Sequence, residues 1–217
     1  MATATHDLVA ARTEEIPFIA DTTFTYPAST VIKSGTLSED FAVQGVHFKK
    51  GSILGFDEKG MLWRCNISED TVINGLACKS KSEVEFFPEG NVLSCMLSAD
   101  TYIGGISAAI GTLVMFHRNG SIFKCDMVHD TVIDGYPVRS GGDVCFFDNG
   151  RLSAFYLSEY CAIEGISCKA GTRVWLREDR RLSACTAGRD VIIQGDLYKA
   201  GELIVFREDG VLLDYRS

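Results

Sequence analysis

An ungapped repeat of thirty residues constrains this chain more than any other feature. The segment Leu-Ser-x-Asp, or a variant of it, begins six times at thirty-residue steps: at Leu37, Ile67, Leu97, Met127, Leu157 and Ala187. An Asp stands three residues into every repeat except the fifth, and a glycine recurs from Gly45 through Gly195 at the same interval. A fixed period of this kind is the signature of a repeat architecture, so each repeat is expected to be one supersecondary unit packed on its neighbours.

Two further glycine series predict turns. One runs from Gly60 to Gly210 within Asp-Asn-Gly or similar sequences and is broken by Arg180; the other runs from Gly51 to Gly201 and is broken by Lys81. Glycine is favoured where a three-residue hairpin loop needs a positive φ. We therefore expect two hairpin turns and three short strands in each repeat, at about residues 71–79, 82–87 and 91–97 in the second.

The predicted fold is all-β, with six tandem thirty-residue units of three short, mainly antiparallel strands. Apolar residues lie on both faces of these strands: Leu76 and Cys78 share one face, whereas Ile73 faces the other way unless Gly75 is a bulge. This pattern favours a flattened or rolled multi-layer sheet, with a β-solenoid as the alternative. Residues 1–16 are expected to be a mobile N-terminal tail, 17–36 an N-terminal cap or partial repeat, and 37–217 the six-repeat domain.

Charge and cysteine usage narrow the function. The net charge of −8 disfavours nucleic-acid and anionic-membrane partners, which need a basic face. Of the eight cysteines, four share one repeat position, at which the other copies carry Phe155 and Tyr215, and Cys78 and Cys168 share another. This pattern indicates apolar core sites rather than disulfides. A thiolate metal site is the alternative, but no Cys-x-x-Cys spacing occurs. We expect a cytoplasmic protein without metal or cofactor.

Known catalytic motifs do not appear in the sequence, and the Asp series has a structural interpretation. One carboxylate per repeat, from Asp40 to Asp190, stands between the third strand of one repeat and the first strand of the next. Ser and Asp side chains at such points accept hydrogen bonds from turn N–H groups. We therefore expect these residues to stabilise turns between repeats rather than to form a paired acid–base site.

One hairpin has a family resemblance. The segment Phe86-Phe87-Pro-Glu-Gly90-Asn-Val92-Leu93 resembles MORN repeats and the related bacterial antitoxin-type β-hairpin repeats, in which an aromatic, a turn glycine and an aliphatic recur. The likeness extends over all six repeats, 37–217, but only in this hairpin; the unit here is longer and lacks the Tyr-x-Gly-x-Trp signature. No functional residue is carried over. The resemblance implies an elongated antiparallel β array serving as a binding or scaffolding surface.

The fifth repeat departs most from the pattern. Tyr160 replaces the turn Asp, Trp175 stands in the second predicted strand, and Arg180 replaces the hairpin glycine. Positions that abandon a repeat without structural benefit are candidates for selected function. Tyr160, Trp175 and Arg180, with His129 from the preceding repeat, are therefore the candidate functional surface; drift in one degenerate copy is the alternative.

Two classes of function remain. The first is a cytoplasmic β-repeat binding or scaffold module with a protein partner. The second is a small cofactor-independent isomerase- or cyclase-type enzyme, or a ligand-binding protein, that holds a small hydrophobic ligand in an apolar cavity between the sheet layers. An enclosed apolar pocket with a few polar groups would favour the second, and an exposed apolar strip over a filled core would favour the first.

Overall fold

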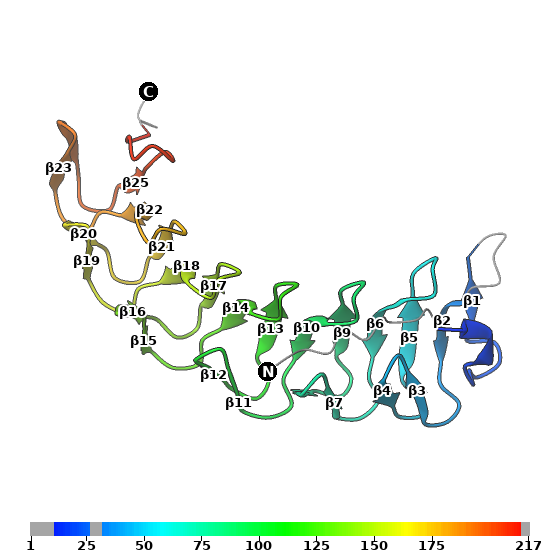
Figure 1. Cartoon of the computed structure of the whole chain (residues 1–217). Helices are drawn as coiled ribbons and strands as arrows, with labels where there is room; N and C mark the ends of the chain where they lie inside the picture. The colour runs from blue at the N-terminus through cyan, green and yellow to red at the C-terminus, as the bar shows by residue number, and fades with distance from the viewer. Residues whose placement is uncertain (1–10, 27–31, 214–217) are drawn as a thin grey trace. The chain divides into compact units, whose positions relative to one another are not determined.

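The computed structural model describes residues 11–26 and 32–213. The chain is all-β, as predicted, and its strand pairs are antiparallel. It divides into two compact parts, residues 1–120 and 121–217, which are described separately below. In each part long strands form one large antiparallel sheet, and short two-stranded hairpins alternate with them along the chain (Figure 1).

In the N-terminal part the large-sheet strands are ordered β1-β2-β5-β6-β9-β10-β13. Their bounds are Phe24–Thr25 (β1), Ile32–Thr36 (β2), Ile53–Phe56 (β5), Leu62–Asn66 (β6), Glu83–Phe86 (β9), Val92–Met96 (β10) and Leu113–Phe116 (β13). The small hairpins are Phe41–Val43 (β3) with Val46–Phe48 (β4), Thr71–Ile73 (β7) with Leu76–Cys78 (β8), and Thr101–Ile103 (β11) with Ile106–Ala108 (β12). A 3-10 helix, η1, spans Thr13–Glu15.

The C-terminal part repeats this plan, with its large-sheet strands ordered β14-β17-β18-β21-β22-β25. Their bounds are Ile122–Asp126 (β14), Asp143–Phe146 (β17), Leu152–Tyr156 (β18), Arg173–Leu176 (β21), Leu182–Thr186 (β22) and Leu203–Val205 (β25). The small hairpins are Thr131–Ile133 (β15) with Tyr136–Val138 (β16), Cys161–Ile163 (β19) with Ile166–Cys168 (β20), and Val191–Ile193 (β23) with Asp196–Tyr198 (β24).

The first predicted strand of each repeat is in fact two strands, so the count of three per repeat is corrected to four. In the second repeat Asn74 and Gly75 have φ of 51° and 82° and connect β7 to β8. Two successive positive φ angles are typical of the type I′ turn, which joins the two strands of a hairpin through a two-residue loop. Ile73 therefore pairs with Leu76 and lies on the same face of the hairpin. The opposite facing of Ile73 that one continuous strand would require does not arise.

The glycine series from Gly51 to Gly201 marks corners and not the expected hairpins. The strands on either side of such a glycine, β4 and β5 for example, belong to different sheets. At the first corner the N–H of Gly51 donates to the Leu37 carbonyl at 2.9 Å. Lys81 keeps this geometry at φ 58° and donates to Ile67 in the same way. Each corner therefore turns the chain from a small hairpin back into the large sheet.

Each part has two layers with a filled core between them. Alternate residues of the large-sheet strands point toward the small hairpins and are buried, as expected for the two-residue period of strands. The large sheets contribute Leu54, Phe56, Val84, Val144, Phe155 and Val174, the hairpins contribute Val43, Phe48, Ile73, Val138, Ile163 and Cys168, and the corners contribute Leu37, Ile67, Leu97 and Leu157. All eight cysteines are free thiols, and six are buried.

The described part of the N-terminal segment makes a contact that recurs in the later repeats. Phe18 forms a bridge with Leu37, just as Cys78 does with Leu97 sixty residues later. Its ring lies against Gly35, where a Cβ would come within 2.6 Å, and meets Phe56 edge-on with ring centroids 6.4 Å apart. Of the predicted tail, residues 1–10 lie outside the described residues.

Candidate functional site

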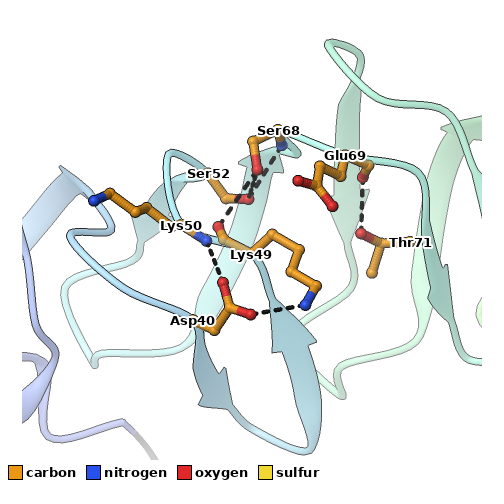
Figure 2. Close-up of polar contacts among 7 residues, drawn as sticks. All are labelled: Asp40, Lys49, Lys50, Ser52, Ser68, Glu69 and Thr71. Atoms are coloured by element: carbon orange, nitrogen blue, oxygen red, sulfur yellow. Dashed lines mark hydrogen bonds and ion pairs between the residues drawn. The ribbon is translucent and has the colours of Figure 1, made fainter.

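The Asp series holds the corners, as the sequence analysis expected. Figure 2 shows the first corner, where Asp40 accepts a hydrogen bond from the backbone N–H of Lys50 at 2.9 Å. Asp40 also forms an ion pair with Lys49, whose Nζ lies 2.7 Å from its carboxylate. The Asp residues of four later repeats accept the equivalent N–H bond from Ser80, Ile110, Ser140 and Ala200. These carboxylates close turns one repeat apart and do not form a catalytic pair.

Three of the four candidate residues lie at different places in the C-terminal part. His129 is exposed at the corner after β14, and Tyr160 is exposed at the corner after β18, where its ring lies beside Gly188. Arg180 stands in the loop between β21 and β22 at φ 73°, and its Nη2 donates to the Asp134 carbonyl at 3.3 Å. The interactions of these three residues do not bring them into one site.

Trp175, the fourth candidate, belongs to a cluster on the outer face of the large sheet, opposite the small hairpins. It stands on β21 between Ala154 and Ala184 of the neighbouring strands and is 39% exposed. The two alanines leave its indole uncovered on both sides. Arg173 lies two residues earlier on the same strand and face, with its guanidinium 5.7 Å from the Trp175 ring centroid.

The cluster is organised around Arg173. Its guanidinium reaches past β18 to Asp143 on β17 and binds both carboxylate oxygens, at 2.9 and 3.1 Å. It also lies 5.3 Å from the ring centroid of Tyr156, its direct cross-strand neighbour. Lys124 Nζ adds a contact to Asp143 at 3.4 Å. A bidentate pair held between two rings fixes the rotamer of a long side chain, so the Arg173 guanidinium is held in one orientation.

The electrostatics of the cluster fit binding better than catalysis. Partial burial raises the pKa of Asp143, but the hydrogen bonds and charge of Arg173 outweigh it, and the pKa of this carboxyl lies below its ordinary value. Cys145 accepts a hydrogen bond from Arg173 Nη2 at 3.4 Å, yet burial raises the pKa of its thiol. The thiol is therefore protonated at neutral pH and is a poor nucleophile.

Asp143, Tyr156 and Arg173 are not among the residues predicted from the sequence, although the repeat contains two signals for them. Asp143 and Arg173 occupy the same position in successive repeats, so opposite charges thirty residues apart lie two strands apart on one face. Gly142 stands where the preceding repeats carry Ser or Thr. A Cβ there would lie 2.8 Å from the Tyr156 ring, so this glycine makes room for the ring.

A second apolar surface lies on the outer side of the small hairpins. In the N-terminal part Val72 and Tyr102 are 70% and 77% exposed, and in the C-terminal part Val132 and Ile192 are 69% and 72% exposed. They occupy one repeat position, but Ala42 and Ala162 take that position in two other hairpins. This row is regular but has neither the ring contacts nor the ion pair of the Arg173 cluster.

No protein family matches this sequence, and a search of curated proteins finds no significant match. Among residues 11–26 and 32–213, no three His, Cys, Asp or Glu side chains come together in a way that could hold a metal ion. Over the same residues, no helix has the length and apolar character needed to cross a membrane.

Proposed function

We propose that this protein is a cytoplasmic β-repeat binding module that docks a protein partner on the outer face of its C-terminal large sheet. Trp175, Tyr156 and Arg173 serve as the anchors of this docking face. The observation that carries the proposal is the Asp143–Arg173 ion pair held against two aromatic rings on an exposed sheet face.

The composition of the cluster supports a protein partner. Trp, Tyr and Arg are the residues most enriched among those that dominate interface energies. Because Asp143 already neutralises Arg173, a partner can cover the guanidinium without supplying a carboxylate of its own. Burying an unpaired charge would cost several kcal/mol, so this internal pairing lowers the free-energy cost of docking.

The packing of the core argues for a binding surface over an enzyme with an interior cavity. Side chains such as Phe155, Val174 and Cys168 fill the space between the two layers of the C-terminal part and are fully buried. The exposed apolar groups lie on the outside, as at Trp175. The cytoplasmic location in the proposal rests on the eight free thiols, since persistent disulfides are typical of oxidising compartments.

The test compares capture of partners by matched variants. Three proteins are immobilised: wild type, the double variant Trp175→Ala/Tyr156→Ala, and the hairpin control Val132→Ser/Ile192→Ser. Extract of the cells that express the protein is passed over each, and the captured proteins are quantified by mass spectrometry. A partner that uses the docking face should lose roughly 30-fold in affinity on the outer-face variant, the effect of about 2 kcal/mol at an anchor. The hairpin control should change affinity less than about threefold.

The opposite pattern would count against the proposal. Loss of the partner on the hairpin control, with full retention on Trp175→Ala/Tyr156→Ala, would move the binding surface to the small hairpins. Circular dichroism and thermal unfolding of each variant establish that the fold is retained, which we expect because both sets of side chains are solvent-accessible.

A further inference from the structure

A cleft of about 470 Å³ opens in the C-terminal part, away from the docking face. It lies between the hairpins β19–β20 and β23–β24 and the loop that joins β21 to β22. Ile166, Leu182 and Phe206 provide apolar walls, and Arg177, Arg181 and Glu164 provide charged ones. Its volume lies in the range of small-molecule sites, and its lining combines apolar and charged groups.

The two arginines of the cleft differ in what they can still bind. Arg177 Nη1 donates to the Glu208 carbonyl at 2.7 Å and its Nη2 donates to the Arg207 carbonyl, so its guanidinium is engaged by the neighbouring loop. Arg181 uses only its Nε, which lies 3.6 Å from Glu164 Oε1. Within the described part of the chain, the Nη1 and Nη2 atoms of Arg181 have no hydrogen-bond acceptor.

The repeat shows why this arginine is presented to the cleft. In the second and sixth repeats the hairpin tip carries an amide, Asn74 or Gln194, that donates to the carbonyl of the loop glycine, at 3.0 and 2.9 Å. In the fifth repeat the tip carries Glu164, whose carboxylate has no proton to donate. One of its oxygens accepts the Leu182 N–H at 3.1 Å, and the other faces Arg181.

The charges of the cleft contrast with those of the whole chain. Arg177 and Arg181 against Glu164 leave the lining with a formal charge of +1, whereas the protein carries −8. The open edge of Arg181 presents two parallel N–H groups, the geometry that a carboxylate binds in bidentate fashion. The apolar walls lie in the same cleft as this edge.

We propose that this cleft binds a small amphipathic carboxylate. The carboxylate receives two hydrogen bonds from Nη1 and Nη2 of Arg181, and the apolar body of the ligand packs against Ile166, Leu182 and Phe206. The site is separate from the docking face and does not depend on the proposed protein partner.

Octanoate and 1-octanol serve as probes, because they share a chain length and differ in the charged head. Isothermal titration calorimetry should show saturable binding of octanoate and at least about tenfold weaker binding of 1-octanol. Arg181→Gln should weaken octanoate binding by roughly tenfold or more, the effect of losing charge-assisted hydrogen bonds. Arg151→Gln is the matched control, because Arg151 holds the same repeat position outside the cleft, and it should change the dissociation constant less than about twofold.

Two further measurements keep the outcome decisive. Arg181→Lys retains the charge without the forked geometry, so it should bind octanoate more weakly than wild type and more tightly than Arg181→Gln. In methyl NMR of isotopically labelled isoleucines, octanoate should shift Ile166 and Ile192, which line the cleft, and leave Ile53 of the N-terminal part unmoved. Absence of saturable octanoate binding, equal affinity of the Arg181→Gln variant, or shifts confined to isoleucines outside the cleft would overturn the proposal.

Discussion

The loop that carries Arg180 offers a sharp test of how the repeat controls stability. Arg180 occupies a left-handed position at φ 73°, where the matching glycines, Gly60, Gly90 and Gly210 among them, have φ of 78°, 79° and 84°. The turn itself is retained, since the Arg180 N–H donates to the Arg177 carbonyl at 2.8 Å. The sequence alone suggests that Arg180→Gly stabilises the protein by about 1 kcal/mol.

The structure revises that magnitude. Relief of the left-handed strain contributes about 1.5 kcal/mol, and the greater freedom of glycine in the unfolded chain offsets about 0.5 kcal/mol of it. The exposed hydrogen bond from Arg180 to the Asp134 carbonyl, worth about 0.5 kcal/mol, is also lost. Arg180→Gly should therefore be about 0.5 kcal/mol more stable than wild type. It should be about 1 kcal/mol more stable than Arg180→Ala, which loses the bond and keeps the strain.

Urea denaturation followed by circular dichroism measures these differences. The matched pair is Arg151→Gly and Arg151→Ala, because Arg151 lies in the corresponding hairpin at a position without positive φ. There the order should reverse, with glycine less stable than alanine by about 0.5–1 kcal/mol. Equal stability of Arg180→Gly and Arg180→Ala, or a more stable Arg180→Ala, would show that the left-handed conformation of residue 180 costs no free energy.

Three other predictions follow from single contacts. Tyr160→Asp should be tolerated and gain up to about 1 kcal/mol, because the new carboxylate can accept the Ala170 N–H as the other corner Asp residues do; a loss of stability in thermal unfolding would contradict this. Gly35→Ala should cost about 1–3 kcal/mol, since its Cβ would lie 2.6 Å from the Phe18 ring, and an unchanged urea midpoint would show that the ring yields freely. Asp143 has a folded-state pKa below its unfolded value of about 3.9, so it stabilises the fold above that pH and ceases to do so as pH falls through the folded pKa. The stability gap between wild type and Asp143→Asn should thus be constant above about pH 5 and shrink below about pH 4, whereas a gap independent of pH would refute the linkage.

The repeat made the fold class readable from sequence, but one local signal was misassigned. The sequence pattern allows Gly75 to be a bulge within one strand, but Asn74-Gly75 is a strong hairpin signal and forms the turn between β7 and β8. The equivalent dipeptides Gln44-Gly45 and Glu164-Gly165 have no such preference, yet their first residues adopt φ of 51° and 49°. Packing of the hairpin against the large sheet therefore imposes on these residues a backbone conformation that they do not favour by themselves.

Of the four residues predicted to form one functional surface, only Trp175 lies in the Arg173 cluster. Departure from the repeat pattern identified that residue, but it also selected His129, Tyr160 and Arg180, which lie elsewhere. The cluster depends on lateral neighbours in the sheet, and each such neighbour is found only when the strand order and register are known. Opposite charges at the same position of adjacent repeats, such as Asp143 and Arg173, indicate that register, because the thirty-residue period places them on one face of the sheet.

The pairing registers have a consequence for how the chain reaches its fold. Every strand pair in the described residues joins partners within about twenty residues of each other, as between Ser34 and Gly55 or between Ala184 and Val205. The hydrogen bonds from hairpin tips to loops, such as the one from Asn74 to the Gly90 carbonyl, are equally local in sequence. Such a low contact order is unusual for a β protein and favours folding in milliseconds rather than seconds. During synthesis, which proceeds from the N-terminus, each repeat can complete its pairing once the next few strands have left the ribosome.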